Sequence, residues 1–341
     1  MAEEIYDKKN MKKILEGFPE QIKEAYDIPV SIRLKGKPSM IIICGMGGSS
    51  ISGQILESYM KIEKLAIPLI NVSSYDIPAY ADANSLFLIN SYSGNTEETI
   101  SCLRQAMKIS GNIIIIASGG KLIEMAESAR LPFIMIPKGL QPRNAIAYLF
   151  FPLMKILEEN NLIDSQATNV KNLINALKKN SRTYDDTAKE LAEKISERIP
   201  IVFSSDILYP VAYRWKSEFN ENSKTLSFCN RLPELDHNEI LGFLNTKALK
   251  AGLHIIILKD EYDHKRIIKR MLITKKLIKE VNAEVTFTEI NIKGPDALTR
   301  IFTTIHLGDL ISYYLAMIYA TDPTPVEIIE RLKKEMGPFI N

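Results

Sequence analysis

The sequence of 341 residues contains few of the residues that bind metals or form disulfides, and almost no net charge. It has three cysteines, four histidines and one tryptophan, and its 43 basic residues balance 41 acidic ones to a net charge of +2. The cysteines (Cys44, Cys102 and Cys229) lack C-x-x-C spacing, which argues against a disulfide framework and favours buried free thiols in a reducing compartment. The histidines are dispersed without metal-ligand spacing. The small net charge excludes a global attraction to nucleic acid or membrane.

Long apolar runs are also missing. The longest uncharged apolar stretch, residues 145–154, is far shorter than the ~18 residues that span a bilayer. The first residues are charged and lack the apolar core of a signal peptide. A basic stretch at 263–279 fits the solvated face of a helix better than a nucleic-acid patch, because the whole chain is nearly neutral. We therefore expect a cytoplasmic protein with no nucleic-acid or membrane partner.

Strands and helices are predicted to alternate in both halves of the chain. The first half contains strand patterns at 39–45, 66–74, 85–93, 112–118 and 131–137, and helix patterns at 49–62, 96–109 and 120–129. The second half contains strand patterns at 199–205, 249–259 and 283–290, and helix patterns at 209–221, 263–281, 297–320 and 324–337. Continuous runs of Ile, Leu and Val in the strands indicate parallel sheets covered on both faces.

The predicted fold class is α/β, with two doubly wound, flavodoxin-like parallel-sheet subdomains that are structural repeats of each other, and with helices at both ends of the chain. The predicted boundaries are an amino-terminal helical segment (1–30), a first domain (31–155), a helical linker (156–196) and a second domain that includes the last helix (197–341).

A glycine-rich loop follows the first predicted strand, in "IIICGMGGSSISG". It nearly matches the dinucleotide pattern G-x-G-x-x-G, but Ser50 replaces the third glycine, and Asn71 and Ser73 stand where the ribose-binding acid belongs. No lysine follows as a nucleoside-triphosphate loop requires. Both nucleotide interpretations therefore fail.

A second loop, in "NSYSGNTEET", carries Ser91, Ser93 and Thr96 ahead of another helix. Hydroxyls and free backbone N–H groups at a helix amino terminus suit a compact phosphate dianion. The alternative is that Ser93 or Thr96 only caps the helix. Two adjacent Gly/Ser loops favour a small phosphorylated ligand over capping, and Gly47, Gly48 and Ser49 would complete the phosphate site.

These two loops resemble those of a sugar isomerase (SIS) domain. The segments "FNENSKTLSFCNRLPELDHNEILGF" and "TPVEIIERLKKEMG" resemble the bifunctional phosphoglucose/phosphomannose isomerases of the phosphoglucose isomerase superfamily. The resemblance implies a cofactor-independent and metal-independent aldose–ketose isomerase that interconverts glucose 6-phosphate and mannose 6-phosphate with fructose 6-phosphate through an enediol. It also implies a homodimer.

Four residues are candidates for the chemistry. For the base, Glu218 and Glu221 compete on one predicted helix; periodicity places both on the solvated side, and the resemblance favours Glu221. The resemblance assigns His237 to ring opening, supplied by the partner subunit, although a lone histidine is more often structural. It places a catalytic lysine in the last helix, where Lys333 aligns better than Lys334.

Arg143, after the fifth predicted strand, suits an anion or an enediolate oxygen, with a structural ion pair as the alternative. The pattern of the last helix turns Ile329 and Leu332 inward and leaves its lysines at the surface. Two other functions stay open: a non-catalytic sugar-phosphate sensor, and an isomerase restricted to one aldose. An aminosugar synthase is disfavoured, because no amidotransferase domain is present.

Overall fold

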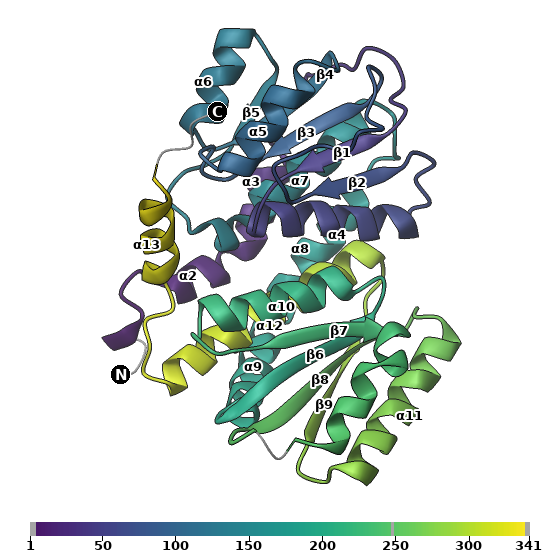
Figure 1. Cartoon of the computed structure of the whole chain (residues 1–341), viewed down its shortest axis with the longest axis vertical. Helices are drawn as coiled ribbons and strands as arrows, with labels where there is room; N and C mark the ends of the chain where they lie inside the picture. Colours follow the sequence, from purple (N-terminus) through teal and green to yellow (C-terminus); the bar gives the residue numbers. More distant parts are fainter. Residues whose placement is uncertain (1–4, 247–248, 338–341) are drawn as a thin grey trace. The chain divides into compact units, whose positions relative to one another are not determined.

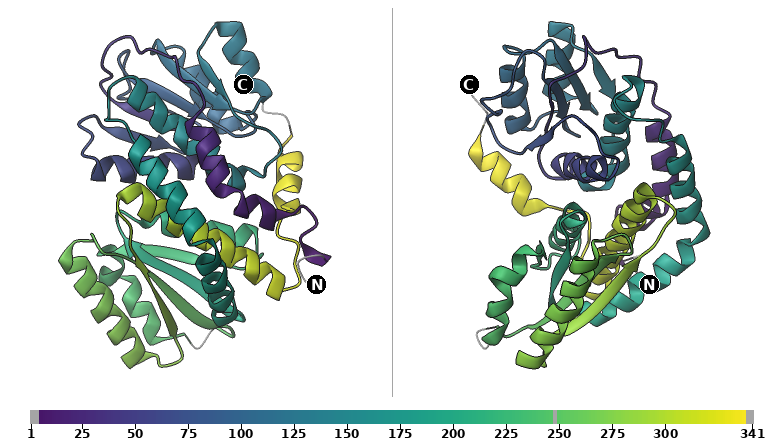
Figure 2. Two further views of the ribbon diagram at one scale, coloured as in Figure 1. Left: turned by 180° about the vertical axis from the view of Figure 1, so that it is seen from behind. Right: turned by 90° about the vertical axis from the view of Figure 1, so that its right-hand side faces the viewer.

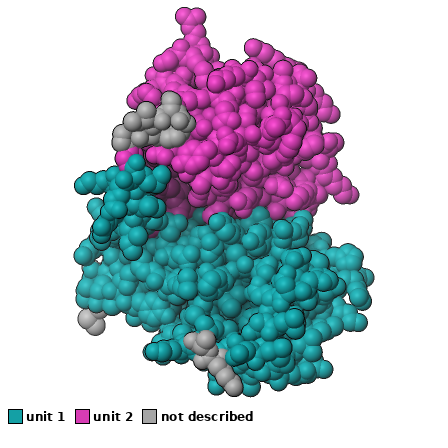
Figure 3. Space-filling view, viewed as in Figure 1, with its two compact units in different colours: residues 1–16, 175–336 teal, residues 17–174, 337–341 magenta. Residues whose placement is uncertain are grey.

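A computed structural model describes residues 5–246 and 249–337. The chain divides into two compact units (Figure 3): unit 1 consists of residues 1–16 and 175–336, and unit 2 of residues 17–174 and 337–341. The predicted amino-terminal segment and the predicted linker are each divided between the two units. Helix α8 (Ala167–Lys179) crosses the second boundary.

Unit 2 is built on five parallel strands in the order β2-β1-β3-β4-β5 (Figure 1). The strands are β1 (Ile41–Cys44), β2 (Leu69–Val72), β3 (Leu86–Asn90), β4 (Asn112–Ala117) and β5 (Phe133–Met135). The helices are α3 (Phe18–Tyr26), α4 (Gly48–Ile62), α5 (Glu97–Ala106), α6 (Gly120–Ala129), η1 (Pro142–Ala145) and α7 (Ile146–Glu159). One face of the sheet packs on α5 and α6 through an apolar cluster that includes Ile89, Leu103 and Ile123, while α4 packs against α7, and α7 against α3. Because helices cover both faces (Figure 2), β1, β3 and β4 are buried along their whole length.

Unit 1 is built on four parallel strands in the order β7-β6-β8-β9. The strands are β6 (Arg198–Ser205), β7 (Phe228–Leu232), β8 (Gly252–Asp260) and β9 (Thr286–Ile292). The helices are α2 (Met11–Glu16), α9 (Ser181–Ile195), α10 (Tyr209–Glu221), η2 (Glu234–His237), η3 (Glu239–Leu244), α11 (Lys265–Val281), α12 (Ala297–Ile318) and α13 (Glu327–Met336). One face of the sheet packs on η2, η3 and α11, and α10 packs on β6 and against α12, which contacts α9.

Helix α12 is the long apolar helix of unit 1. By length and composition alone it could cross a membrane, but 94% of its most apolar window is buried inside the protein. Helix α2 is held against it by Lys12, whose ammonium contacts the Asp185 carboxylate and the Tyr314 hydroxyl. Burial alone would raise the pKa of Asp185, but its bonds with Lys12, Lys189 and Tyr314 outweigh burial and lower that pKa to about 2.

The two sheets share one strand order, which confirms the predicted pair of flavodoxin-like repeats. Strands β6, β7, β8 and β9 take the positions of β1, β2, β3 and β4, and unit 1 lacks a counterpart of β5. In this order the chain reverses direction across the sheet between the first and third strands of each unit, and the loops after those strands meet at that switch point.

Three sequence predictions differ from the structure. Strand β7 was not predicted; it is a short edge strand with polar residues in its middle. Helix α13 has no buried residue, and Ile329 and Leu332 are 40% and 59% exposed, so their predicted inward orientation is wrong. Cys44 and Cys102 are buried as expected, whereas Cys229 is only partly buried.

Candidate active site

The glycine loop connects β1 to α4 at the switch point of unit 2. Gly47 has φ of +52°, a left-handed conformation that favours glycine, and α4 begins at Gly48. A Cβ on Gly45 would lie 2.8 Å from the Asn90 carbonyl oxygen, and a Cβ on Gly48 would lie 3.0 Å from that of Pro142. No side chain caps α4, so the first N–H groups of the helix have no side-chain acceptor at the loop. The glycines thus make a tight loop with backbone donors at its mouth.

The second loop joins β3 to α5 and brings its hydroxyls together. Ser91 Oγ lies 2.9 Å from Thr96 Oγ1 and also accepts a hydrogen bond from the Gly94 N–H. Thr96 occupies the N-cap position of α5 but makes no side-chain cap bond, and Ser93 Oγ accepts from the Asn95 N–H. The alternative that these hydroxyls only cap the helix therefore does not hold in this structure.

Gly94 can only be glycine at this position. Its φ is +68°, and a Cβ would lie 1.8 Å from the carbonyl oxygen of Gly119. Any side chain would push the second loop away from the loop after β4.

The two loops are bonded to each other. Ser49 Oγ accepts from the Tyr92 N–H at 3.2 Å. Asn90, the last residue of β3, donates from Nδ2 to the Ser49 carbonyl oxygen at 3.3 Å and to Ser52 Oγ at 2.8 Å. Asn90 was not among the predicted site residues; its only signal in the sequence is an amide at the end of an apolar strand. The six predicted phosphate-binding residues thus lie on two connected loops.

The end of β2 offers no acidic group for a ribose. Asn71 Nδ2 donates to the Glu57 carboxylate at 2.8 Å, and Ser73 Oγ is 2.6 Å from Ser50 Oγ. The donors at this switch point are neutral hydroxyls and backbone amides, which suit a small phosphate rather than a dinucleotide.

Arg143 lies on η1, directly against the glycine loop. Its Cα would be 3.5 Å from a Cβ on Gly48, and its side chain is 3% exposed. The neighbouring Asn144 is also buried, and its Nδ2 has no hydrogen-bond acceptor within the described part of the chain. The structure therefore brings a guanidinium and an amide donor to the same loop.

The two candidate bases on α10 have different environments. Glu218 is 2% exposed, forms an ion pair with Arg214 at 3.1 Å and accepts a hydrogen bond from Asn222 Nδ2 at 2.9 Å, so its predicted solvated position is wrong. Arg214 also makes a two-point contact with Asp309, at 3.1 and 2.9 Å. Periodicity missed this burial because Asp309 is distant in sequence.

Glu221, by contrast, is the last residue of α10 and is partly exposed. Burial alone would lower the pKa of Arg214, but Asp309, Glu218 and, more weakly, Glu221 raise it well above its usual range. Glu218 is thus committed to the buried pair with Arg214, whereas Glu221 lies where the helix ends.

His237 and Lys333 lie on two further elements of unit 1. His237 ends η2 and is exposed, next to Asp236, whose carboxylate pairs with Arg270 at 2.8 Å. Lys333 and Lys334 are both exposed on α13, as their pattern predicts. Within the described residues, no group of three or more His, Cys, Asp or Glu side chains could hold a metal ion. The predicted catalytic residues thus fall on both units, with Arg143 and the phosphate loops on unit 2.

The corresponding switch point of unit 1 is acidic. Asp260, the last residue of β8, pairs with Arg300 at 3.0 Å, and both side chains are buried. Asp263 follows in the loop to α11, and its Oδ2 accepts from the Asp260 N–H at 3.1 Å. Burial raises the pKa of Asp263. The loops of unit 1 therefore lack the neutral, anion-binding character of those in unit 2.

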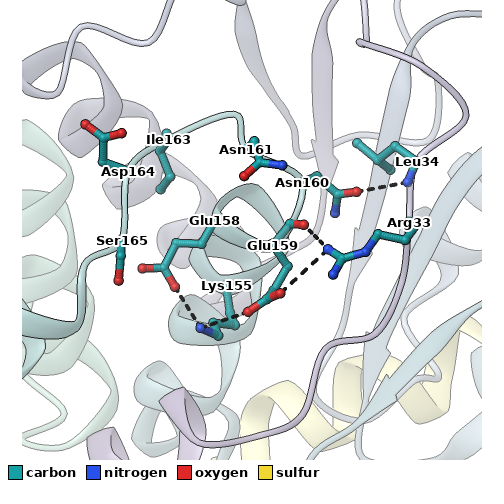
Figure 4. Close-up of a pocket in the computed structure, with 10 residues that line it drawn as sticks. All are labelled: Arg33, Leu34, Lys155, Glu158, Glu159, Asn160, Asn161, Ile163, Asp164 and Ser165. Carbon is teal, nitrogen blue, oxygen red and sulfur yellow. Dashed lines mark hydrogen bonds and ion pairs between the residues drawn. The ribbon is translucent and has the colours of Figure 1, made fainter.

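A polar pocket of about 520 Å³ lies at the opposite edge of the unit 2 sheet (Figure 4). Lys155 lies between Glu158 and Glu159, 3.1 Å from each, and Arg33 contacts Glu159. The same segment is bonded to Asn112, the first residue of β4, so the pocket is at the amino ends of the strands, away from the phosphate loops. Its charges are paired with each other, which indicates a structural role.

Comparisons with known proteins agree with this site. Residues 184–336 match the family model described as the bacterial phospho-glucose isomerase C-terminal SIS domain. A bifunctional phosphoglucose/phosphomannose isomerase of Caldicellulosiruptor bescii is 39% identical over 94% of this chain and 97% of its own length. One of Aquifex aeolicus is 34% identical over 98% of both chains.

A relative with a different name is nearly as similar. The D-glucosamine-6-phosphate 4-epimerase of Sulfolobus acidocaldarius is 34% identical over 72% of this chain and 77% of its own length. Among solved structures, the C-terminal domain of glucosamine-fructose-6-phosphate aminotransferase from Francisella tularensis superposes with a TM-score of 0.70 over 92% of this chain and 98% of that chain, at 19% identity. That likeness concerns the fold alone.

Proposed function

The chain belongs to the family of bifunctional phosphoglucose/phosphomannose isomerases, and from that premise we propose that it interconverts glucose 6-phosphate and mannose 6-phosphate with fructose 6-phosphate. The observation that carries this proposal is the pair of bonded loops after β1 and β3, where neutral donors suit one small phosphate. The sugar phosphate is held there by Gly47, Gly48, Ser49, Ser91, Ser93 and Thr96.

The reaction moves one proton between C1 and C2 of the open-chain sugar. A carboxylate base takes the proton from one carbon, leaving an enediolate, and returns it to the other carbon. Glu221 is our candidate for this base, because Glu218 is already paired with Arg214 and Asn222. Arg143, next to the glycine loop, would stabilise the negative oxygen of the enediolate.

Ring opening precedes this step and needs a proton at the ring oxygen. An imidazole and an ammonium can both supply one near neutral pH, and His237 and Lys333 are our candidates. Lys334 stays as the alternative lysine, since both side chains are exposed on α13. No step of the proposed route needs a metal or an organic cofactor.

A homodimer in the cytoplasm is part of the proposal. Large apolar side chains are exposed on the elements that flank His237: Leu226 (62%), Phe228 (50%), Leu241 (67%) and Leu244 (62%). Neighbouring residues line a pocket of about 760 Å³. An exposed apolar patch of this kind is typical of a protein–protein interface, and a second copy covering it would bring its His237 to the partner's site. The free thiols suit a reducing compartment.

The first test is turnover of fructose 6-phosphate by the purified protein in EDTA, with both aldose phosphates quantified. We expect both to form, Glu221→Gln to form neither, and Glu218→Gln, the matched control on the same helix, to stay active. Formation of only one aldose would leave a selective isomerase, and binding without turnover would leave a sensor. Conversion of glucosamine 6-phosphate to its 4-epimer would instead favour the activity named for the Sulfolobus relative.

A second test asks which subunit supplies His237. Inactive Glu221→Gln and His237→Asn proteins are mixed and allowed to exchange subunits. If His237 acts across the interface, one site of each mixed dimer is intact and activity returns. If each chain uses its own His237, every site has a defect and the mixture stays inactive.

A further inference from the structure

Two of the three cysteines of the chain lie beside the proposed phosphate site. Cys44 is the last residue of β1, immediately before the glycine loop. Cys102 lies on α5, the helix that follows the second loop. Both side chains are buried, 0% and 1% exposed, in the same apolar cluster between the sheet and α5.

The sheet register brings the two thiols together. Cys44 is paired with Val72 of β2, and the Cys102 thiol donates to the carbonyl oxygen of Ser74, two residues beyond Val72, at 3.3 Å. The two thiols are also hydrogen-bonded to each other. Only the exposed residues Ser74 and Tyr75 cover the Cys102 sulfur on this side, through their backbone carbonyls.

We propose that Cys44 and Cys102 are a modification site, at which a peroxide links them in a reversible intramolecular disulfide. Two thiols in contact, joined to different elements and separated from solvent by one exposed turn, provide the arrangement that such a reaction needs.

The chemistry balances with peroxide as the two-electron oxidant. The Cys102 thiolate attacks one peroxide oxygen, which gives a sulfenic acid and hydroxide, and the Cys44 sulfur then displaces the second hydroxide. With the two thiol protons, one peroxide becomes two waters and two thiols become one disulfide. Cys102 is assigned the attack because its hydrogen bond with Cys44 lowers the pKa of its thiol, whereas the same bond, followed by burial, raises the pKa of Cys44.

A disulfide would change the spacing of the two phosphate loops. An S–S bond of about 2.05 Å is shorter than any non-bonded sulfur contact, so the end of β1 and α5 must move toward each other. One loop begins directly after Cys44, and α5 begins directly after the other. This consequence rests on the proposed function: we expect oxidation to raise the KM for fructose 6-phosphate by about tenfold, since small displacements of positioned groups have effects of this size.

The test treats the full-length protein with hydrogen peroxide and then alkylates it under denaturing conditions. We expect two of the three thiols to be lost, the peptides containing Cys44 and Cys102 to be linked in mass spectra, and dithiothreitol to reverse both changes. Cys229→Ser should behave like the wild type, and Cys102→Ala should form no linked peptide. Cys229 is more exposed than either partner, so it controls for accessibility.

Each outcome decides the proposal. Three alkylatable thiols after oxidation, or sulfinic acids without a linked peptide, would overturn it. A linked peptide with an unchanged KM would establish the modification site and refute its effect on the phosphate loops. The mass readout does not depend on turnover, so it stands even if the protein proves not to be an isomerase.

Discussion

Replacing Arg214 by methionine should cost unit 1 a large part of its stability. The guanidinium contacts Glu218 at 3.1 Å and Asp309 at 2.9 Å, and all three side chains are at most 3% exposed. Arg214→Met leaves two carboxylates buried beside each other without a cation. Breaking a buried pair in this way destabilises a protein by about 3–5 kcal/mol. For a unit of this size that corresponds to a fall in the melting temperature of about 6–20 °C.

The loss should depend on pH in a definite direction. Without the guanidinium, burial raises the pKa of the two carboxyls in the folded variant above their unfolded values. A group with a raised folded pKa favours folding below its unfolded pKa and loses that contribution as pH rises. The difference in melting temperature between wild type and variant should therefore be large at pH 7.5 and narrow toward pH 4.5.

The assay is calorimetry across this pH range, with two controls. Arg182→Met removes an exposed arginine that pairs with Asp186 at the same i, i+4 spacing, and should shift the melting temperature little. Glu218→Gln and Asp309→Asn, added to Arg214→Met, remove the stranded charges and should restore much of the stability. A shift no larger than that of Arg182→Met, or one that does not narrow at low pH, would refute the account of the buried pair.

Two more predictions concern the second loop and helix α2. Gly94→Ala should raise the KM for fructose 6-phosphate at least tenfold, because its Cβ would meet the Gly119 carbonyl oxygen; Gly36→Ala, at φ +84° with open space around it, is the matched control, and equal effects of the two would show that only backbone strain matters. The Lys12–Asp185 contact should stabilise unit 1 above pH ~4 and lose its contribution as pH falls toward the folded pKa of about 2, because the folded pKa of Asp185 is lowered. Urea unfolding of wild type and Lys12→Met at pH 6 and pH 2.5 checks this, and a difference that does not shrink at the lower pH would contradict it.

Features encoded by neighbouring residues could be predicted from the sequence. The Ile-rich strands and the Gly/Ser loops after β1 and β3 are local patterns, and they correctly indicated two parallel sheets and the positions of the loops. The burial of Glu218 could not be predicted, because its partner Arg214 is itself neutralised by Asp309 from a distant helix. Strand β7 was missed because its FCNRL sequence, at a sheet edge, lacks an apolar run.

The candidate site divides in the same way. Hydroxyl spacing predicted Ser91 and Thr96 as a pair, and they lie 2.9 Å apart. Asn90, which holds both loops, has no local pattern that marks it. The roles of Glu221, His237 and Lys333 stay predictions, because they depend on contacts with a substrate and a second subunit rather than on neighbours in the chain.

The shared strand order of the two sheets has a consequence for ligand stoichiometry. A chain that arose by tandem duplication would inherit two equivalent anion sites, one at each switch point. In unit 1 that position carries Asp260 paired with Arg300, and Asp263 beside it, so a phosphate dianion arriving there would be repelled. One inherited copy has thus exchanged its ligand for an internal ion pair, and each polypeptide retains a single phosphate-binding position.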